Sequence, residues 1–389
     1  MSSIKYSELK RRIELEGQEK TLKHISEALQ KKDLKPDDFS IRDLAETLIT
    51  NGRQWIRELD PRSSYGSTLN ESLEGVDASA FLNITGQLVY NRILESYHSE
   101  LFCLSNAVTT ITTRLDSEKI PGITGIVDDV AEIHAGMPYP NYGFGEDYIE
   151  TPPTLKRGLI IPVTKEAVFF DRTHLILSRA SEVGEILALN KEKRIADMIL
   201  GLSNTYVRQG QSFNTYYASS DNGPWVNVVA SNSLTSLASV EVAENLLTKM
   251  LDPTTLEPVL IEADTILVMP QKKHTASNIL KYHNLSYNNG NLKITDNPFY
   301  KYNILSSRIA YRQLVNSNSE NEAKFADYWY LGNFAKAFAY MENWPVTVSH
   351  SAIGSEAEFS QDILFRFKAS ERGTPAVLNP RYVIKSYNT

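Results

Sequence analysis

A helical pattern of unusual length over residues 171–202 constrains the fold more than any other feature of this sequence. Apolar residues recur there at the three- and four-residue spacing of one helix face. They are Ile176, Ala180, Val183, Leu187, Ile195, Met198, Ile199 and Leu202. An unbroken helix of this length would span roughly 48 Å, whereas the average helix in a globular protein has only about 11–12 residues. We therefore expect one helix to serve as the backbone of the whole chain.

Three residues bear on where this helix begins and how regular it is. Asp171 stands where an N-cap is expected, because its side chain can accept a hydrogen bond from the first free backbone N–H groups. Gly184 should cost about 1 kcal/mol relative to alanine in a helix interior. Asn190 is a candidate position for a kink.

Residues 120–157 have the opposite character, with turn residues and aromatic side chains in place of periodicity. Irregular stretches of this length are uncommon inside compact domains and usually carry a function. Tyrosine and phenylalanine on such a segment are expected to bury against a partner. The candidates for an interface are Tyr139, Tyr142, Phe144 and Tyr148. The segment 136–149 is predicted to be the far end of an arm.

The first sixty residues are rich in charged residues and contain few glycines, a composition that predicts helices. Ile41, Leu44 and Leu48 lie on one apolar stripe, and Ser40 is placed to cap that helix. The stripe must be buried, either against its own subunit or against a neighbouring one. Both alternatives are open from the sequence, and the second makes these three residues interface candidates. The polar stretch 60–67 predicts a linker, after which Asp77 is placed to begin another helix.

The remainder of the chain mixes helix and strand signals. An apolar run over 158–170 is strand-like, and helices are predicted over 234–250 and 272–282. Strands are predicted over 259–269, 302–315, 328–339 and 346–350, with an exposed hairpin or loop over 284–297. Ile363, Phe365 and Phe367 alternate with less apolar residues, as in a half-buried strand. A turn at 372–374 and a last strand over 382–385 complete an α+β pattern.

Charge and composition exclude several classes of function. The net charge is −7, and the charged run at 191–194 and the lysine pair at 272–273 are short, so the sequence lacks the cationic clusters of a protein that reads DNA. No apolar run has the length of a membrane span or a signal peptide, which predicts a product made in the cytoplasm. Cys103 is the single cysteine and is expected to be a small buried hydrophobe.

The order of these parts resembles the Hong Kong 97-type capsid fold of tailed bacteriophages. The residues that carry the resemblance are the loop 120–157, the junction 156–166, the helix 171–202 and the closing stretches 359–368 and 379–385. The resemblance implies an α+β fold with an arm, an extended loop, a spine helix, a peripheral domain and an axial domain. The corresponding division is 1–77 for the N-terminal arm, 78–119 for the lead-in, 120–157 for the loop, 158–224 for the peripheral domain with its helix, 225–345 for the axial domain and 346–389 for the return strands.

The resemblance also implies a function. The chain would be a major capsid protein that assembles through hexamers and pentamers into an icosahedral head, located in the virion and made in the host cytoplasm. Its partners would be further copies of itself, with scaffolding, portal or cement proteins, and double-stranded DNA held by containment and not by sequence readout. No membrane partner and no cofactor is expected. A nanocompartment shell of the encapsulin type is the alternative within the same fold.

An unrecognised α+β hydrolase is the alternative from a different class, and the sequence offers little for it. Phosphate-binding, zinc-binding and nucleophile-elbow motifs are missing. The segment Asp128–His134 has carboxylates and an imidazole suited to a divalent ion, but a solvated charged face explains it as well. The neighbours Ser349 and His350, and the pair Glu356 and Glu358, lack the framing that catalysis needs. We therefore expect no catalytic, cofactor or metal site and no enzyme.

Overall fold

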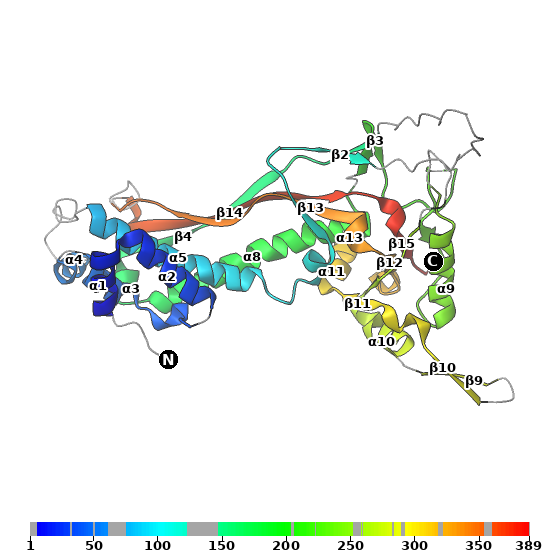
Figure 1. Cartoon of the computed structure of the whole chain (residues 1–389), viewed down its shortest axis with the longest axis horizontal. Helices are drawn as coiled ribbons and strands as arrows, with labels where there is room; N and C mark the ends of the chain where they lie inside the picture. Colours follow the sequence, from blue (N-terminus) through cyan, green and yellow to red (C-terminus); the bar gives the residue numbers. More distant parts are fainter. Residues whose placement is uncertain are drawn as a thin grey trace, which may run out of the picture. The chain divides into compact units, whose positions relative to one another are not determined.

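The computed structural model describes residues 6–31, 33–49, 51–60, 75–122, 147–203, 206–221, 223–251, 258, 260–281, 284–288, 292–317, 322–353 and 360–388. The chain forms two compact units. Unit 1 comprises Met1–Glu100, Lys156–Leu189 and Trp344–Arg372, and unit 2 comprises Leu101–Leu155, Asn190–Asn343 and Gly373–Thr389. Helices and strands are mixed along the chain (Figure 1), which confirms the α+β class.

Unit 1 begins with five helices that pack on one another, and the fifth is the longest of them. They are α1 (Tyr6–Glu16), α2 (Gln18–Gln30), α3 (Ile41–Leu48), α4 (Gly52–Glu58) and α5 (Gly75–Tyr97), with a short 3-10 turn at Pro36–Asp38. Trp55 of α4 meets Phe81 of α5 edge to face, with ring centroids 6.2 Å apart. Phe81 in turn meets Phe365 at 5.9 Å. Because α5 starts at Gly75, Asp77 lies inside the helix, and the predicted cap there is wrong.

Strands from distant parts of the sequence pair in one sheet, and its segments 156–164, 344–350 and 363–372 belong to unit 1. A four-stranded sheet has the order β1–β13–β14–β4, formed by Thr109–Thr112, Phe338–His350, Ile363–Val377 and Leu155–Thr164. Phe365 and Phe367 are fully buried in β14 and Lys368 is exposed, but Leu364 is also fully buried, so the predicted alternation holds only from Phe365 to Lys368. The apolar run at 158–170 divides into β4 and the short helix α7 (Lys165–Phe169), which Thr164 caps through a hydrogen bond from the Ala167 N–H.

The turn predicted at 372–374 is wrong, because β14 continues to Val377. Glycine has another purpose at this position. A Cβ on Gly373 would lie only 2.6 Å from the Tyr340 hydroxyl, so the strand needs glycine for close packing and not for a change of direction.

Unit 2 contains a five-stranded sheet in the order β11–β8–β12–β15–β7. The strands are Asn303–Ser306, Thr265–Val268, Trp329–Gly332, Val383–Ser386 and Val228–Val229. Around them in the chain lie α9 (Leu237–Thr248), α10 (Lys273–Leu280), α11 (Arg308–Ser317), α12 (Glu322–Phe325), α13 (Phe334–Ala337) and 3-10 turns at Pro270–Lys272, Pro298–Lys301 and Pro380–Tyr382. Strands β9 (Asn284–Asn288) and β10 (Leu292–Asp296) form the predicted hairpin.

The strand predicted over 302–315 is right only near its start. β11 ends at Ser306 and α11 follows, because the Ser307 hydroxyl accepts a hydrogen bond from the Ala310 N–H at 3.2 Å and starts the helix. Ala310 and Leu314 are both buried and stand four residues apart, which is helix spacing.

The predicted long helix is confirmed as α8, Thr173–Leu200. Its predicted apolar stripe is buried from Ile176 to Ile199, whereas Leu202 lies beyond the helix and is 41% exposed. Asp171 is not the N-cap, because it has a positive φ of 49° in the turn before the helix. Gly184 allows α5 to approach, since a Cβ there would lie 2.4 Å from the Ile93 carbonyl oxygen.

Candidate assembly elements

The three N-terminal interface candidates lie in the core of unit 1. Ile41, Leu44 and Leu48 are 2%, 0% and 4% exposed and belong to the same hydrophobic cluster as Trp55 and Phe81. Their side chains have no surface to offer a neighbouring subunit. The structure therefore corrects this part of the interface prediction and supports the other alternative, in which the helix packs on its own subunit.

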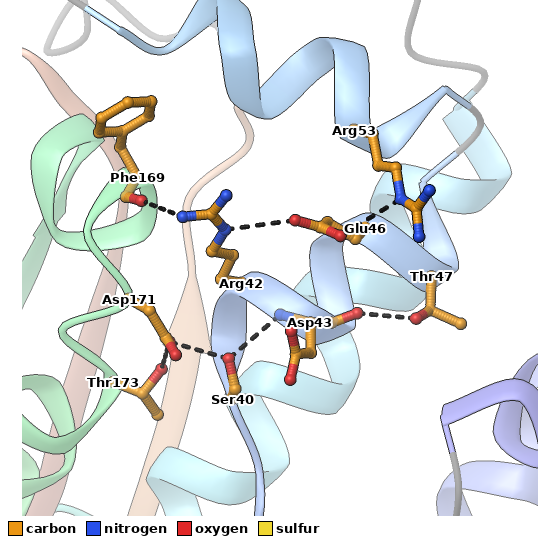
Figure 2. Close-up of polar contacts among 9 residues, drawn as sticks. All are labelled: Ser40, Arg42, Asp43, Glu46, Thr47, Arg53, Phe169, Asp171 and Thr173. Atoms are coloured by element: carbon orange, nitrogen blue, oxygen red, sulfur yellow. Dashed lines mark hydrogen bonds and ion pairs between the residues drawn. The ribbon is translucent and has the colours of Figure 1, made fainter.

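Polar contacts fix α3 on the turn between α7 and α8 (Figure 2). Ser40 caps α3 by accepting a hydrogen bond from the Asp43 N–H at 3.1 Å, as predicted, and its hydroxyl donates to the Asp171 carboxylate at 2.8 Å. Thr173 also donates to Asp171 and accepts from the Ile41 N–H, both at 2.8 Å. Asp171 therefore does not cap α8 as expected. Its carboxylate instead accepts hydrogen bonds from both Ser40 and Thr173, and these contacts join α3 to the start of α8.

Arg42 adds a cationic contact between α3 and α7. Arg42 donates from Nη1 to the Phe169 carbonyl at 2.9 Å and pairs through Nε with Glu46 at 3.2 Å. Burial raises the pKa of Asp43, and repulsion by Asp171 and Glu46 adds to the effect, while Arg42 opposes it. Acidic side chains are therefore concentrated where α3 meets α8, and hydroxyl groups from Ser40 and Thr173 compensate.

The described ends of the predicted loop are ordered strands. β2 (Lys119–Gly122) pairs antiparallel with β3 (Asp147–Glu150), with Lys119 opposite Glu150 and Gly122 opposite Asp147. β5 (Tyr206–Arg208) and β6 (Gln211–Phe213) extend the ribbon to four strands in the order β2–β3–β5–β6. The prediction of an irregular segment over all of 120–157 is thus wrong at both ends.

Tyr148 is the interface candidate that the structure describes in this ribbon. It is half-buried in β3, and the Lys119 ammonium lies 4.4 Å from its ring centroid. Lys119 also pairs with Glu150 at 3.3 Å, and this hydrogen bond is the main reason that the pKa of Lys119 is raised. The other aromatic candidates, Tyr139, Tyr142 and Phe144, lie outside the described residues.

Threonine side chains anchor the base of the ribbon. The Glu118 N–H donates to the Thr151 hydroxyl at 2.8 Å, and the Thr154 hydroxyl donates to Asp116 at 3.1 Å. Thr113 bonds to the Glu118 carboxylate, and its own N–H reaches the Glu342 carbonyl of β13 at 2.9 Å. Thr113, Thr151 and Thr154 are each 5% exposed. A segment that leaves this base therefore does so from a fixed position in unit 2.

Sequence reasoning missed a buried acid in the middle of α8. Glu192 is fully buried in unit 2 and accepts from the Leu104 N–H at 2.7 Å and from the Ser105 N–H at 2.8 Å, as well as from the Ser105 hydroxyl. It thereby satisfies the start of the short helix α6 (Cys103–Ala107). Burial raises the pKa of Glu192, while these hydrogen bonds favour its charged form. Only its position on the buried face of α8 could have indicated it.

The candidates for catalysis and metal binding do not assemble into a site in the part of the chain that the structure describes. No group of three or more potential ligands suited to a metal occurs there. Asp128–His134 and the pair Glu356 and Glu358 fall outside that part. His350 contacts the Asn83 side chain at 3.1 Å. In the described helices, none is both long and apolar enough to span a membrane.

A comparison with known families gives the decisive observation: residues 149–386, more than half of the chain, match the family described as phage capsid protein. The chain belongs to this family. The match contains α8, both strands β13 and β14 and the five-stranded sheet of this capsid protein. It begins within β3, so the N-terminal helices are outside it. A comparison with curated proteins finds no match.

Solved structures similar to this capsid protein include other capsids. One is the capsid of an empty GTA particle, with 14% identity, coverage of 75% of this chain and 91% of that chain, and a TM-score of 0.44. The capsid of Cyanophage P-SCSP1u has 13% identity, 72% and 86% coverage and a TM-score of 0.42. A virus-like particle from Pyrococcus furiosus has 12% identity, 76% and 96% coverage and a TM-score of 0.36. The assignment rests on the family match and not on these scores.

Proposed function

We propose that this chain is the major capsid protein of a tailed bacteriophage with the Hong Kong 97-type fold. It assembles through hexamers and pentamers into an icosahedral head that encloses double-stranded DNA in the virion. The family match over residues 149–386 is the observation that carries this proposal. Capsid proteins of this family are structural, and the function is therefore self-association and not catalysis.

The geometry of the ribbon supports a role in assembly. β2 and β3 hold the two ends of the segment 123–146 in register, and the threonine contacts fix their base. In the proposed shell, the segment contacts an adjacent subunit, with Tyr139, Tyr142 and Phe144 buried in that contact. Each such side chain contributes on the order of 1–2 kcal/mol when buried. Many contacts of this size in a closed shell give a stable whole from individually weak interfaces.

The family match does not favour the encapsulin-type compartment that the sequence left as an alternative. The contents of the particle distinguish the two functions directly. Nuclease-resistant double-stranded DNA inside purified particles supports a phage head, whereas protein cargo without DNA contradicts it. Scaffolding, portal and cement proteins belong to the same proposal as partners of the shell.

Electron microscopy of a loop variant tests the proposed assembly role. The variant replaces residues 136–146 with a short Gly-Ser linker and leaves β3 intact, because Asp147–Glu150 belongs to the sheet. Closed particles should form from the wild-type chain and be lost in the variant, while circular dichroism stays the same. A matched control replaces residues 289–291, which stand between β9 and β10 in the sequence, with Gly-Ser residues. Normal shells from the 136–146 variant would contradict the role of the segment, and no shells from the wild type would contradict the function.

A further inference from the structure

Two N-terminal helices of unit 1 bring cationic side chains together around one open hollow of about 780 Å³. Lys10 and Arg11 come from α1, while Arg53 and Arg57 come from α4. The two pairs are more than forty positions apart in the sequence, so no single cationic run contains all four residues. Both helices pack on α3, whose buried stripe fixes their positions within the unit.

Local backbone geometry holds α4 in place at this hollow. Asn51 has a positive φ of 59° immediately before the helix. A Cβ on Gly52 would lie 2.3 Å from the Ala45 carbonyl oxygen, so α4 begins in direct contact with α3. Arg53 and Arg57 stand four residues apart and therefore share one face of α4.

The cations around the hollow are only partly neutralised. Glu46 pairs with Arg53 at 3.5 Å but also with Arg42 at 3.2 Å, which lies on the α7 side of α3 (Figure 2). Within the described part of the chain, no carboxylate lies within ion-pair distance of Lys10, Arg11 or Arg57. Glu14 is the other acidic side chain at the hollow. Among the described residues, these three exposed cations therefore make no ion pair, although Glu14 and Glu46 also line the hollow.

The chemistry of this lining fits phosphate groups better than a protein surface. Arginine presents several N–H donors in a planar arrangement that matches phosphate oxygens, and lysine adds a point charge. Protein interfaces instead depend on apolar and aromatic anchors at their centre. Ile49 is the apolar side chain of the lining, and it is 2% exposed. The open form of the hollow also suits an extended polymer.

We propose that Lys10, Arg11 and Arg57, with Arg53 beside them, bind the sugar-phosphate backbone of double-stranded DNA. The identity of the polymer rests on the proposed function, in which the shell encloses DNA. The contact is independent of base sequence, because the lining offers charges for phosphates and no exposed aromatic ring for a base. The sequence led us to expect that the shell merely encloses its DNA. This proposal adds one defined contact with the packaged DNA on each subunit.

Fluorescence anisotropy with a labelled DNA duplex and unassembled full-length subunits tests this inference. For three phosphates, the logarithm of the affinity should fall with the logarithm of salt concentration with a slope of roughly −2.7, or about 40-fold between 50 and 200 mM salt. The variant Lys10→Gln, Arg11→Gln, Arg57→Gln should bind at least about tenfold more weakly at 50 mM salt and lose most of this slope. These side chains are exposed, so the fold should be retained.

The matched control removes three exposed lysines of the same unit outside the hollow, Lys20→Gln, Lys23→Gln and Lys31→Gln. It changes the net charge equally and should bind DNA as the wild type does. Wild-type affinity in the first variant, equal loss in the control, or no DNA binding by the wild type would overturn the inference. Tighter binding of polyglutamate than of DNA would also overturn it and indicate an acidic protein partner. Particle formation, scored separately by electron microscopy, tests the proposed function without affecting this result.

Discussion

Replacement of Glu192 by alanine should lower the free energy of unfolding of the subunit by roughly 2–4 kcal/mol. The carboxylate accepts from two backbone N–H groups at 2.7 and 2.8 Å, and it is fully buried together with Leu104. Each donor left without a partner in the interior costs about 1–3 kcal/mol. The substitution also removes the cost of burying a charge, which keeps the net loss toward the lower part of the summed range.

Chemical denaturation of unassembled subunits, followed by circular dichroism, measures this loss. Glu185→Ala is the matched control, because Glu185 lies on the same helix and is exposed. An exposed substitution of this kind should change the free energy of unfolding by less than about 0.5 kcal/mol. Equal, small effects of the two substitutions would refute the reasoning that Glu192 satisfies buried backbone donors.

The same residue predicts a pH dependence with a defined sign. Burial raises the pKa of Glu192 above its ordinary value of 4.5, so the folded state holds this proton more tightly than the unfolded state. The contribution of this group to stability is therefore present below pH 4.5 and is lost as the pH rises through the folded-state pKa. The wild type should lose stability over this interval relative to Glu192→Gln. A difference that is constant with pH would contradict the prediction.

Three further predictions concern unit 1. Gly184→Ala should destabilise the subunit by more than about 1 kcal/mol in a denaturation assay, because the clash with the Ile93 carbonyl outweighs the gain in helix propensity; a stabilised variant would contradict this packing. Tyr97→Phe should cost roughly 1–3 kcal/mol, since it removes a 2.7 Å hydrogen bond to the buried Glu371 carboxylate; an unchanged midpoint would argue against it. Deletion of residues 1–60 should lower the melting temperature as well as impair assembly, because these helices supply core residues; a variant with an unchanged melting temperature that fails to assemble would restore the arm as an external contact.

Local patterns predicted those elements whose signals lie close together in the sequence. The stripe from Ile176 to Ile199 indicated α8, and the alternation around Phe365 indicated β14, because each pattern reports its own buried face. Ser40 likewise identified the start of α3. Where tertiary contacts decide the outcome, the same reasoning was wrong. Gly373 suggested a turn, but the strand contains glycine there because the Tyr340 side chain packs directly against it.

The candidate assembly residues divide in the same way. A stripe such as Ile41 and Leu44 shows that a surface is buried but not which partner buries it, and the structure supplies the partner within the subunit. The hollow between α1 and α4 could not be predicted from the sequence, because Lys10 and Arg57 come together only in the folded chain. The predicted interface at Tyr139, Tyr142 and Phe144 stays a prediction.

The pairing of Gly122 with Asp147 has a consequence for how this chain can vary. Paired residues in an antiparallel ribbon have Cα atoms about 4.5–5.5 Å apart, so the chain leaves the sheet and re-enters it at nearly the same point. Each doubling of the length of an intervening flexible segment adds only about 0.6 kcal/mol of closure entropy. A foreign peptide inserted between these two residues should therefore leave the sheet of unit 2 intact. The same position is open to large differences in length between related chains, and it is a natural point for epitope display.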